Sequence, residues 1–131
     1  MSTLARWIYS LVMGISLLVV SPASVMAEVN DGALGRLIVF TTEYCPYCQE
    51  FMRTVGPVYA KTEVGRRYPM EMVDNFSPSK EWETRVWEIR FYPTFLLLDG
   101  QGRELGRFRG YRGEEPFWSE LETIARREPK P

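Results

Sequence analysis

Cys45 and Cys48 are the two cysteines of this chain of 131 residues, and only two residues separate them. A disulfide across so short a loop restricts the unfolded chain very little, because the entropic gain grows with loop length. A structural zinc site usually needs four ligands, and the chain has no His and no further Cys. Reversible thiol–disulfide chemistry is therefore the favoured interpretation, and we expect neither a metal ion nor another cofactor.

The residues before and after this pair change from a strand pattern to a helix pattern. The apolar run Leu37-Ile38-Val39-Phe40 predicts a strand buried on both faces of a sheet. Pro46 suits the first helical position, because the N–H that it lacks would have no partner there. One face of the predicted helix carries Cys48, Met52, Val55 and Tyr59. Gly56-Pro57 should interrupt this helix, which should end near 65–67.

The rest of the chain predicts three more strands and two more helices. Strands are expected at 70–73, 94–98 and 104–109, the last two joined by the turn 99–102. A second helix should begin at Ser77-Pro78 and bury Trp82, Val86 and Ile89. A last helix after Gly113 should bury Phe117, Leu121 and Ile124. The order βαβαββα predicts an α/β fold with a four-stranded mixed sheet flanked by three helices.

The predicted helix start gives the two cysteines different roles. A helix N-terminus carries unpaired N–H groups and a partial positive charge, which favour a thiolate over a thiol. Cys45 lies at this position and is expected to attack, or be attacked by, an outside sulfur. Cys48 lies one turn further on and faces inward. It is expected to resolve the mixed disulfide.

Three segments together resemble the thioredoxin superfamily: the strand 37–40, the helix start Cys45-Pro46-Tyr47-Cys48, and Tyr92-Pro93-Thr94 before the hairpin. The similarity covers essentially all of 28–131 and implies the thioredoxin fold. It also implies a cis Tyr92–Pro93 bond that packs against the redox pair. Substrate contacts are then expected at Tyr92, Pro93 and Thr94, and at the residues beside the sulfurs, Tyr44, Pro46 and Tyr47. Plain surface cover is the alternative for the two tyrosines beside the pair.

Two features depart from the thioredoxin pattern. The sequence between the cysteines is typical of glutaredoxins, but no Gly-Gly followed by acidic residues comes after Pro93, as a glutathione site would require. Val39 stands where thioredoxins carry a buried acid. Proton transfer at Cys48 must then use another group, and Glu71 or water are the candidates.

The N-terminal segment predicts export. A short basic start, an apolar run over 7–20 and the small residue Ala27 at the cleavage site indicate a signal peptide over 1–27, cleaved after Ala27. An uncleaved membrane anchor is the alternative, but the run is shorter than the roughly 20 residues that span a bilayer. The mature domain, 28–131, should therefore reside in the periplasm. Its interspersed charges, with a net charge of −1 for the whole chain, give no reason to expect a nucleic-acid partner.

Among exported members of the superfamily, the chain most resembles the small periplasmic thioredoxins of bacterial sulfur-oxidation (Sox) systems. The similarity lies in the leader, in Glu43-Tyr44-Cys45-Pro46-Tyr47-Cys48-Gln49, in Tyr92-Pro93-Thr94 and in the short length. It implies a monomer that reduces protein disulfides, keeps a sulfur-carrier cysteine active, and takes electrons from a membrane transporter of the CcdA/DsbD type. The alternatives are a disulfide-forming oxidant of the DsbA type, a glutathione-dependent glutaredoxin, and a redox-inactive binding or chaperone module.

Overall fold

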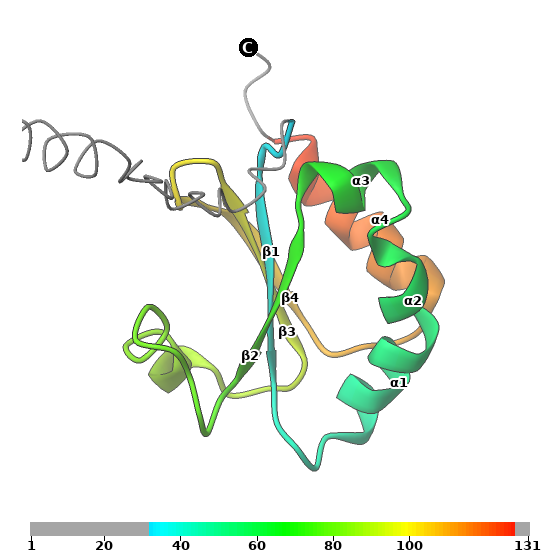
Figure 1. Ribbon diagram of the computed structural model, residues 1–131. Helices are drawn as coiled ribbons and strands as arrows, with labels where there is room; N and C mark the ends of the chain where they lie inside the picture. Colours follow the sequence, from blue (N-terminus) through cyan, green and yellow to red (C-terminus); the bar gives the residue numbers. More distant parts are fainter. Residues whose placement is uncertain (1–31, 128–131) are drawn as a thin grey trace, which may run out of the picture.

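A computed structural model describes residues 32–127, which form one mixed sheet with helices on one side (Figure 1). The strands are β1 (Gly35–Thr41), β2 (Met70–Asp74), β3 (Thr94–Asp99) and β4 (Glu104–Arg109), in the order β2-β1-β3-β4. β1 pairs in parallel with β2, while β3 runs antiparallel to both β1 and β4. This arrangement confirms the predicted fold class.

The predicted first helix is divided into three short ones. α1 (Pro46–Thr54), α2 (Gly56–Tyr59) and α3 (Glu63–Arg67) follow one another before β2, and α4 (Glu114–Ala125) ends the described chain. The break between α1 and α2 falls at Val55, directly before Gly56-Pro57, which was predicted to interrupt the helix, because proline supplies no N–H for the preceding turn. All four helices cover the same face of the sheet (Figure 1).

Each face of the sheet has its own apolar core. Alternate residues of β1 and β3 face the helices, where Leu37, Val39 and Phe95 pack with Phe51 and Phe117. On the other face, a segment between β2 and β3 covers the sheet with three side chains. They are Trp82, Val86 and Ile89, the residues that sequence predicted to be buried.

The helix predicted to begin at Ser77-Pro78 is wrong. Residues 80–85 form turns, and the only regular element between β2 and β3 is the 3-10 helix η1 (Val86–Glu88). Bonds such as Trp82 N–H to Ser79 O and Ile89 N–H to Val86 O join residues three apart. The apolar side chains still face inward. The segment is short and rich in β-branched and aromatic residues, which propagate an α-helix poorly.

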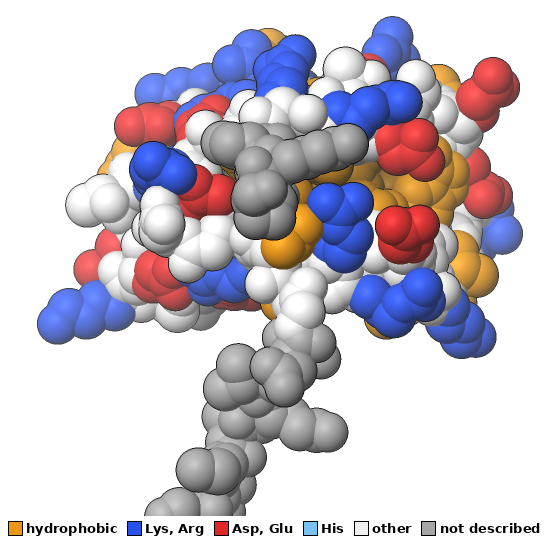
Figure 2. Space-filling model, turned by 90° about the horizontal axis from the view of Figure 1, so that it is seen from above, with side chains coloured by type: hydrophobic (Ala, Val, Ile, Leu, Met, Phe, Trp, Pro, Cys, Tyr) orange, Lys and Arg blue, Asp and Glu red, His pale blue; other side chains and the backbone are white. Residues whose placement is uncertain are grey.

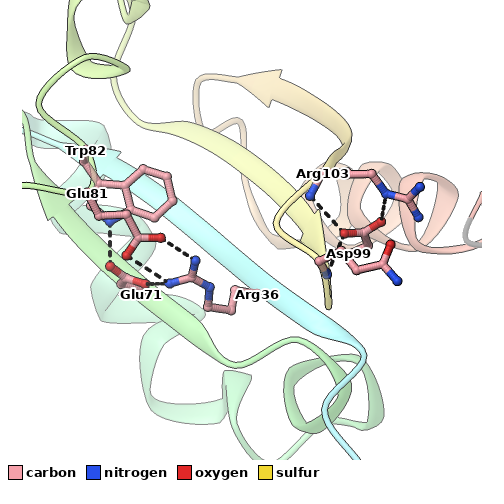
Figure 3. Close-up of polar contacts among 7 residues, drawn as sticks. Arg36, Glu71, Glu81, Trp82, Asp99 and Arg103 are labelled. Carbon is pink, nitrogen blue, oxygen red and sulfur yellow. Dashed lines mark hydrogen bonds and ion pairs between the residues drawn. The ribbon is translucent and has the colours of Figure 1, made fainter.

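Polar contacts hold this turn segment against the sheet (Figure 3). Arg36 on β1 donates to Glu71 on β2 at 2.9 Å and to Glu81 at 2.6 Å. The indole N–H of Trp82 donates to the other Glu71 oxygen at 2.7 Å, and the Arg36 guanidinium lies 5.5 Å from the Trp82 ring. The hydrogen bond from Arg36 lowers the pKa of the Glu81 carboxyl. Glu81 and Trp82 of the turn segment are thereby held against β1 and β2, although the segment forms no α-helix.

Surface charge at the α3 end of the sheet is mixed in sign. Figure 2 shows this end with Lys and Arg side chains lying among Asp and Glu side chains. No helix within 32–127 is long and apolar enough to cross a membrane. The predicted signal peptide, 1–27, lies outside the described residues.

The buried face of α1 differs from the prediction at one position. Met52, predicted to face the core, is 39% exposed, whereas Phe51 is fully buried. The Phe51 ring lies 4.9 Å from that of Phe95 and 5.1 Å from that of Phe117. The aromatic cluster, rather than the helical period alone, sets which of the two neighbours turns inward.

We predict that Phe51→Ala lowers the free energy of unfolding by about 3–5 kcal/mol, because it opens a cavity in the aromatic core. Met52→Ala, the matched control one position along, should change it by less than about 1 kcal/mol. Urea unfolding followed by tryptophan fluorescence measures both. Equal losses in the two variants would contradict the buried face assigned to α1.

Candidate active site

The two cysteines lie at the start of α1, shortly after the end of β1. They are joined by a disulfide, with the Cα atoms 5.2 Å apart. Cys45 is the N-cap of α1, with extended backbone angles, and its Sγ accepts the backbone N–H of Cys48 at 3.1 Å. The sulfur thus takes the place that a Ser or Asp oxygen usually fills at an N-cap. A developing thiolate at Cys45 would receive this same N–H and the positive end of the helix dipole.

The exposed fractions of Cys45 and Cys48 differ less than expected from the predicted outer position of Cys45 and inner position of Cys48. Cys45 is 7% exposed and Cys48 is 4% exposed in this disulfide state. Position separates them instead. Pro46 occupies the first turn of α1, and Cys48 lies on the buried face of the helix with Phe51. Met52, expected beneath Cys48, lies outward.

The loop before β3 has the predicted backbone, and the Tyr92–Pro93 peptide bond is cis. The sheet register pairs Thr94 with Phe40, which precedes the redox motif on β1. Gly110, with a φ of 74°, donates its N–H to Pro93 O at 2.7 Å and so ties the loop to the end of β4. The fold therefore brings the loop and the cysteine pair to one end of the sheet.

The substrate contacts predicted from sequence differ in accessibility. Tyr44 and Tyr47 are 86% and 63% exposed and flank the cysteine pair. Tyr92 is partly buried, and burial raises the pKa of its hydroxyl. Thr94 is 2% exposed, and its hydroxyl donates to Phe91 O at 2.7 Å within the loop. The side chain of Thr94 thus stabilises the loop, and its backbone pairs with Phe40 on one side and with Arg109 on the other.

Sequence reasoning missed two exposed aromatic residues at this end of the sheet. Phe76 follows β2 and is 82% exposed, and Phe91 precedes the cis bond and is 59% exposed. Single exposed apolar side chains are ordinary on a protein surface, so exposure alone assigns neither residue a function. The only signal in the sequence was the position of Phe91 beside Tyr92-Pro93, because Phe76 lies in a polar turn with no motif.

Glu71 cannot serve as the proton carrier for Cys48. It lies on the sheet face opposite α1, where it binds Arg36 and Trp82 (Figure 3). Val39, in the position of the thioredoxin acid, is fully buried in the helix-side core. Of the two candidates from sequence, water remains.

A cavity of about 490 Å³ lies between α3 and α4, lined by Val64, Arg67 and Trp118 among others. It is at the end of the sheet opposite Cys45, and its lining includes no cysteine. The described residues contain no cluster of three or more His, Cys, Asp or Glu that could hold a metal ion. Chemistry within 32–127 is therefore concentrated at the disulfide.

Comparison with known families agrees with this geometry. Residues 23–125 match the thioredoxin-like domain family. The chain belongs to the thioredoxin-like family. As a family member with an intact Cys-x-x-Cys pair, it is a thiol–disulfide oxidoreductase, and proteins of this kind act on protein thiols and disulfides.

Solved structures of family members include one of substantial sequence identity. The reduced form of the periplasmic thioredoxin SoxS from Paracoccus pantotrophus is 31% identical, with a TM-score of 0.63, over 72% of this chain and 98% of that one. A thioredoxin from Thermus thermophilus shares the fold at 23% identity and a TM-score of 0.51, over 70% and 74% of the two chains. No curated protein sequence gives a significant match.

We predict that limited iodoacetamide treatment of the reduced protein at about pH 6 alkylates Cys45 well before Cys48. The N-cap position favours the Cys45 thiolate, which is the reactive species, whereas Cys48 faces the core. Peptide mapping by mass spectrometry after timed quenching gives the order of labelling. Labelling of Cys48 first, or of both at equal rates, would contradict the assigned geometry.

Proposed function

We propose that this thioredoxin-like protein is an exported reductase of protein disulfides, and that its target is the carrier cysteine of a sulfur-oxidation system. The observation that carries the proposal is the pair at the start of α1, beside the cis Tyr92–Pro93 loop, in a chain 31% identical to a periplasmic thioredoxin over almost all of that protein. The predicted signal peptide, 1–27, is the route to the periplasm.

The reaction transfers two electrons from the Cys45–Cys48 dithiol to a substrate disulfide. The Cys45 thiolate attacks one substrate sulfur, which forms a mixed disulfide and releases the other substrate sulfur as a thiolate. Cys48 gives its proton to water and attacks Cys45 Sγ. This closes the disulfide seen in the structure and releases the second substrate thiol.

The oxidised pair must then be reduced again. We propose that a membrane electron transporter of the CcdA/DsbD type supplies the two electrons, because a periplasmic protein has no access to cytosolic reductants. Both exchanges need one accessible sulfur and one shielded sulfur, and a monomer with a single pair suffices.

The main alternatives lack support in the fold. DsbA-type oxidants insert a helical domain between the second strand and the cis-Pro strand, whereas residues 75–93 hold only turns and η1. A glutathione-dependent glutaredoxin is favoured by Pro46-Tyr47 between the cysteines, but the glutathione-binding Gly-Gly signature is missing from the sequence. The disulfide pair itself argues against a redox-inactive module.

We predict that Cys48→Ser traps a mixed disulfide between Cys45 and its protein substrate, because the resolving thiol is gone. The complex should survive non-reducing electrophoresis of periplasmic extracts and release one partner on reduction. The matched control, Cys45→Ser, should trap nothing and should lose disulfide exchange.

Mass spectrometry of the trapped partner then tests the target. A cysteine in the carrier protein of a sulfur-oxidation system is the expected result. Failure of Cys48→Ser to trap any protein, or activity that survives Cys45→Ser, would overturn the division of roles.

A further inference from the structure

Two arginines beside the cis-Pro loop have no acidic partner. Within 32–127, Arg85, Arg103 and Arg107 each lie within 4 Å of a carboxylate, at 3.5, 2.7 and 2.6 Å. Arg90 and Arg109 make no such ion pair with any described residue, and both are exposed. An unpaired guanidinium keeps all of its donors free for a carboxylate from outside.

Both unpaired arginines lie close to residues of the loop 90–93, which precedes β3. The sheet register places Arg109 opposite Thr94, the residue after Pro93. Its guanidinium lies 5.8 Å from the ring of Phe91. Arg90 lies close enough to Tyr92 to lower the pKa of the hydroxyl, although the larger effect of burial raises it. The two cations thus approach the loop from β4 and from the preceding segment.

A small hollow lies between these residues. Its volume is about 70 Å³, and its lining includes Arg90, Phe91, Thr94 and Arg109. That is room for a carboxylate group, since a water in the liquid occupies about 30 Å³. One acidic residue, Glu88, also lines the hollow, 3.8 Å from Arg107, which pairs more closely with Glu104. Arg107 lines the hollow as well, so the lining holds three arginines and one glutamate.

The hollow lies at the same end of the sheet as the redox pair but on the face opposite α1, because Arg109 pairs with Thr94, and Thr94 with Phe40 of the second core. A bound substrate would have to cross the end of β3 to reach it. Neighbouring strands lie about 4.8 Å apart, so β4 is about 10 Å from β1, the strand that leads to Cys45. An extended segment advances about 3.3 Å per residue, so a residue about two to four positions from the reacting cysteine spans that gap. The backbone N–H and C=O of Tyr92 have no partner among the described residues and are free to bind such a segment.

We propose that Arg90 and Arg109 bind an acidic side chain of the protein substrate, two to four residues from the cysteine that Cys45 attacks. The proposal rests on the proposed reductase function and adds a preference among protein substrates. Partners with Glu or Asp near the reactive cysteine are reduced faster than partners with neutral residues there. Phe91, beneath the Arg109 guanidinium, holds that cation in place over the loop.

The test compares peptide disulfides that differ only in charge. Two homodimeric peptides carry a central Cys with either Glu or Gln at the third position on each side. The second-order rate constant for oxidation of the reduced protein is measured for each peptide by stopped flow. Each value is divided by the rate constant for reduction of the same peptide by dithiothreitol, which removes differences in intrinsic reactivity.

We expect a Glu-to-Gln ratio of about two- to tenfold for the wild type, the range that two exposed ion pairs provide. The ratio should fall to about one in Arg90→Gln/Arg109→Gln, and toward one for the wild type in about 1 M salt, which screens exposed charges. The control Arg66→Gln/Arg127→Gln removes two exposed arginines at the far end of the sheet and should keep the ratio. Arg90→Glu/Arg109→Glu should instead prefer a peptide with Lys at those positions.

Each other outcome decides against the proposal. A wild-type ratio near one, or a ratio that persists in Arg90→Gln/Arg109→Gln, overturns it. Oxidised glutathione is assayed as a third substrate. If Arg90→Gln/Arg109→Gln slows the reduction of glutathione alone and leaves both peptide rates unchanged, the two arginines bind the carboxylates of that tripeptide, and the proposal is also wrong. Failure to reduce either peptide would count against the reductase function itself, which is a different result from a ratio of one.

Discussion

The Sγ of Cys45 and the backbone N–H of Cys48 meet at 3.1 Å at the first turn of α1, and this contact determines the character of the redox centre. It makes a cysteine the N-cap of the helix, so a negative sulfur is stabilised by backbone donors rather than by a cationic side chain. The chain has no His, and Val39 replaces the buried acid of thioredoxins. The backbone N–H groups and the helix dipole therefore provide most of the stabilisation of the Cys45 thiolate.

The position of that helix start depends on the aromatic core beneath it. Phe51 locks α1 to β3 and to α4 through its contacts with Phe95 and Phe117. A second anchor comes from Tyr111, whose hydroxyl lies 2.6 Å from that of Thr54 near the end of α1. The opposite face of the sheet relies on a turn segment held by the Arg36, Glu71 and Trp82 contacts. The core on the helix side thus positions α1 and its cysteines. The core on the opposite face positions the turn segment that leads into the cis Tyr92–Pro93 bond.

Sequence predicted the strands, their succession along the chain and the redox pair, because each depends on local pattern. The order of the strands within the sheet, β2-β1-β3-β4, came only from the structure. The predictions were wrong where tertiary packing decides between two conformations or two neighbouring residues that the local sequence allows equally. Trp82, Val86 and Ile89 have a spacing that suits an α-helix, yet the same spacing buries them from turns and a 3-10 helix. Phe51 and Met52 both fall near the inner stripe of α1, and only the ring cluster decides between them. Arg109 lies in the predicted strand 104–109, and its place opposite Thr94 became visible only with the strand register.

The reduction potential of the Cys45–Cys48 pair tests the central claim most directly. Equilibration of the purified domain, residues 28–131, with glutathione or dithiothreitol buffers, followed by alkylation and mass analysis, gives this value. A reductase should have a potential near that of thioredoxin, roughly −270 mV, so that it donates electrons to substrate disulfides. A potential near that of DsbA, roughly −120 mV, would contradict the account and make the protein a disulfide-forming oxidant.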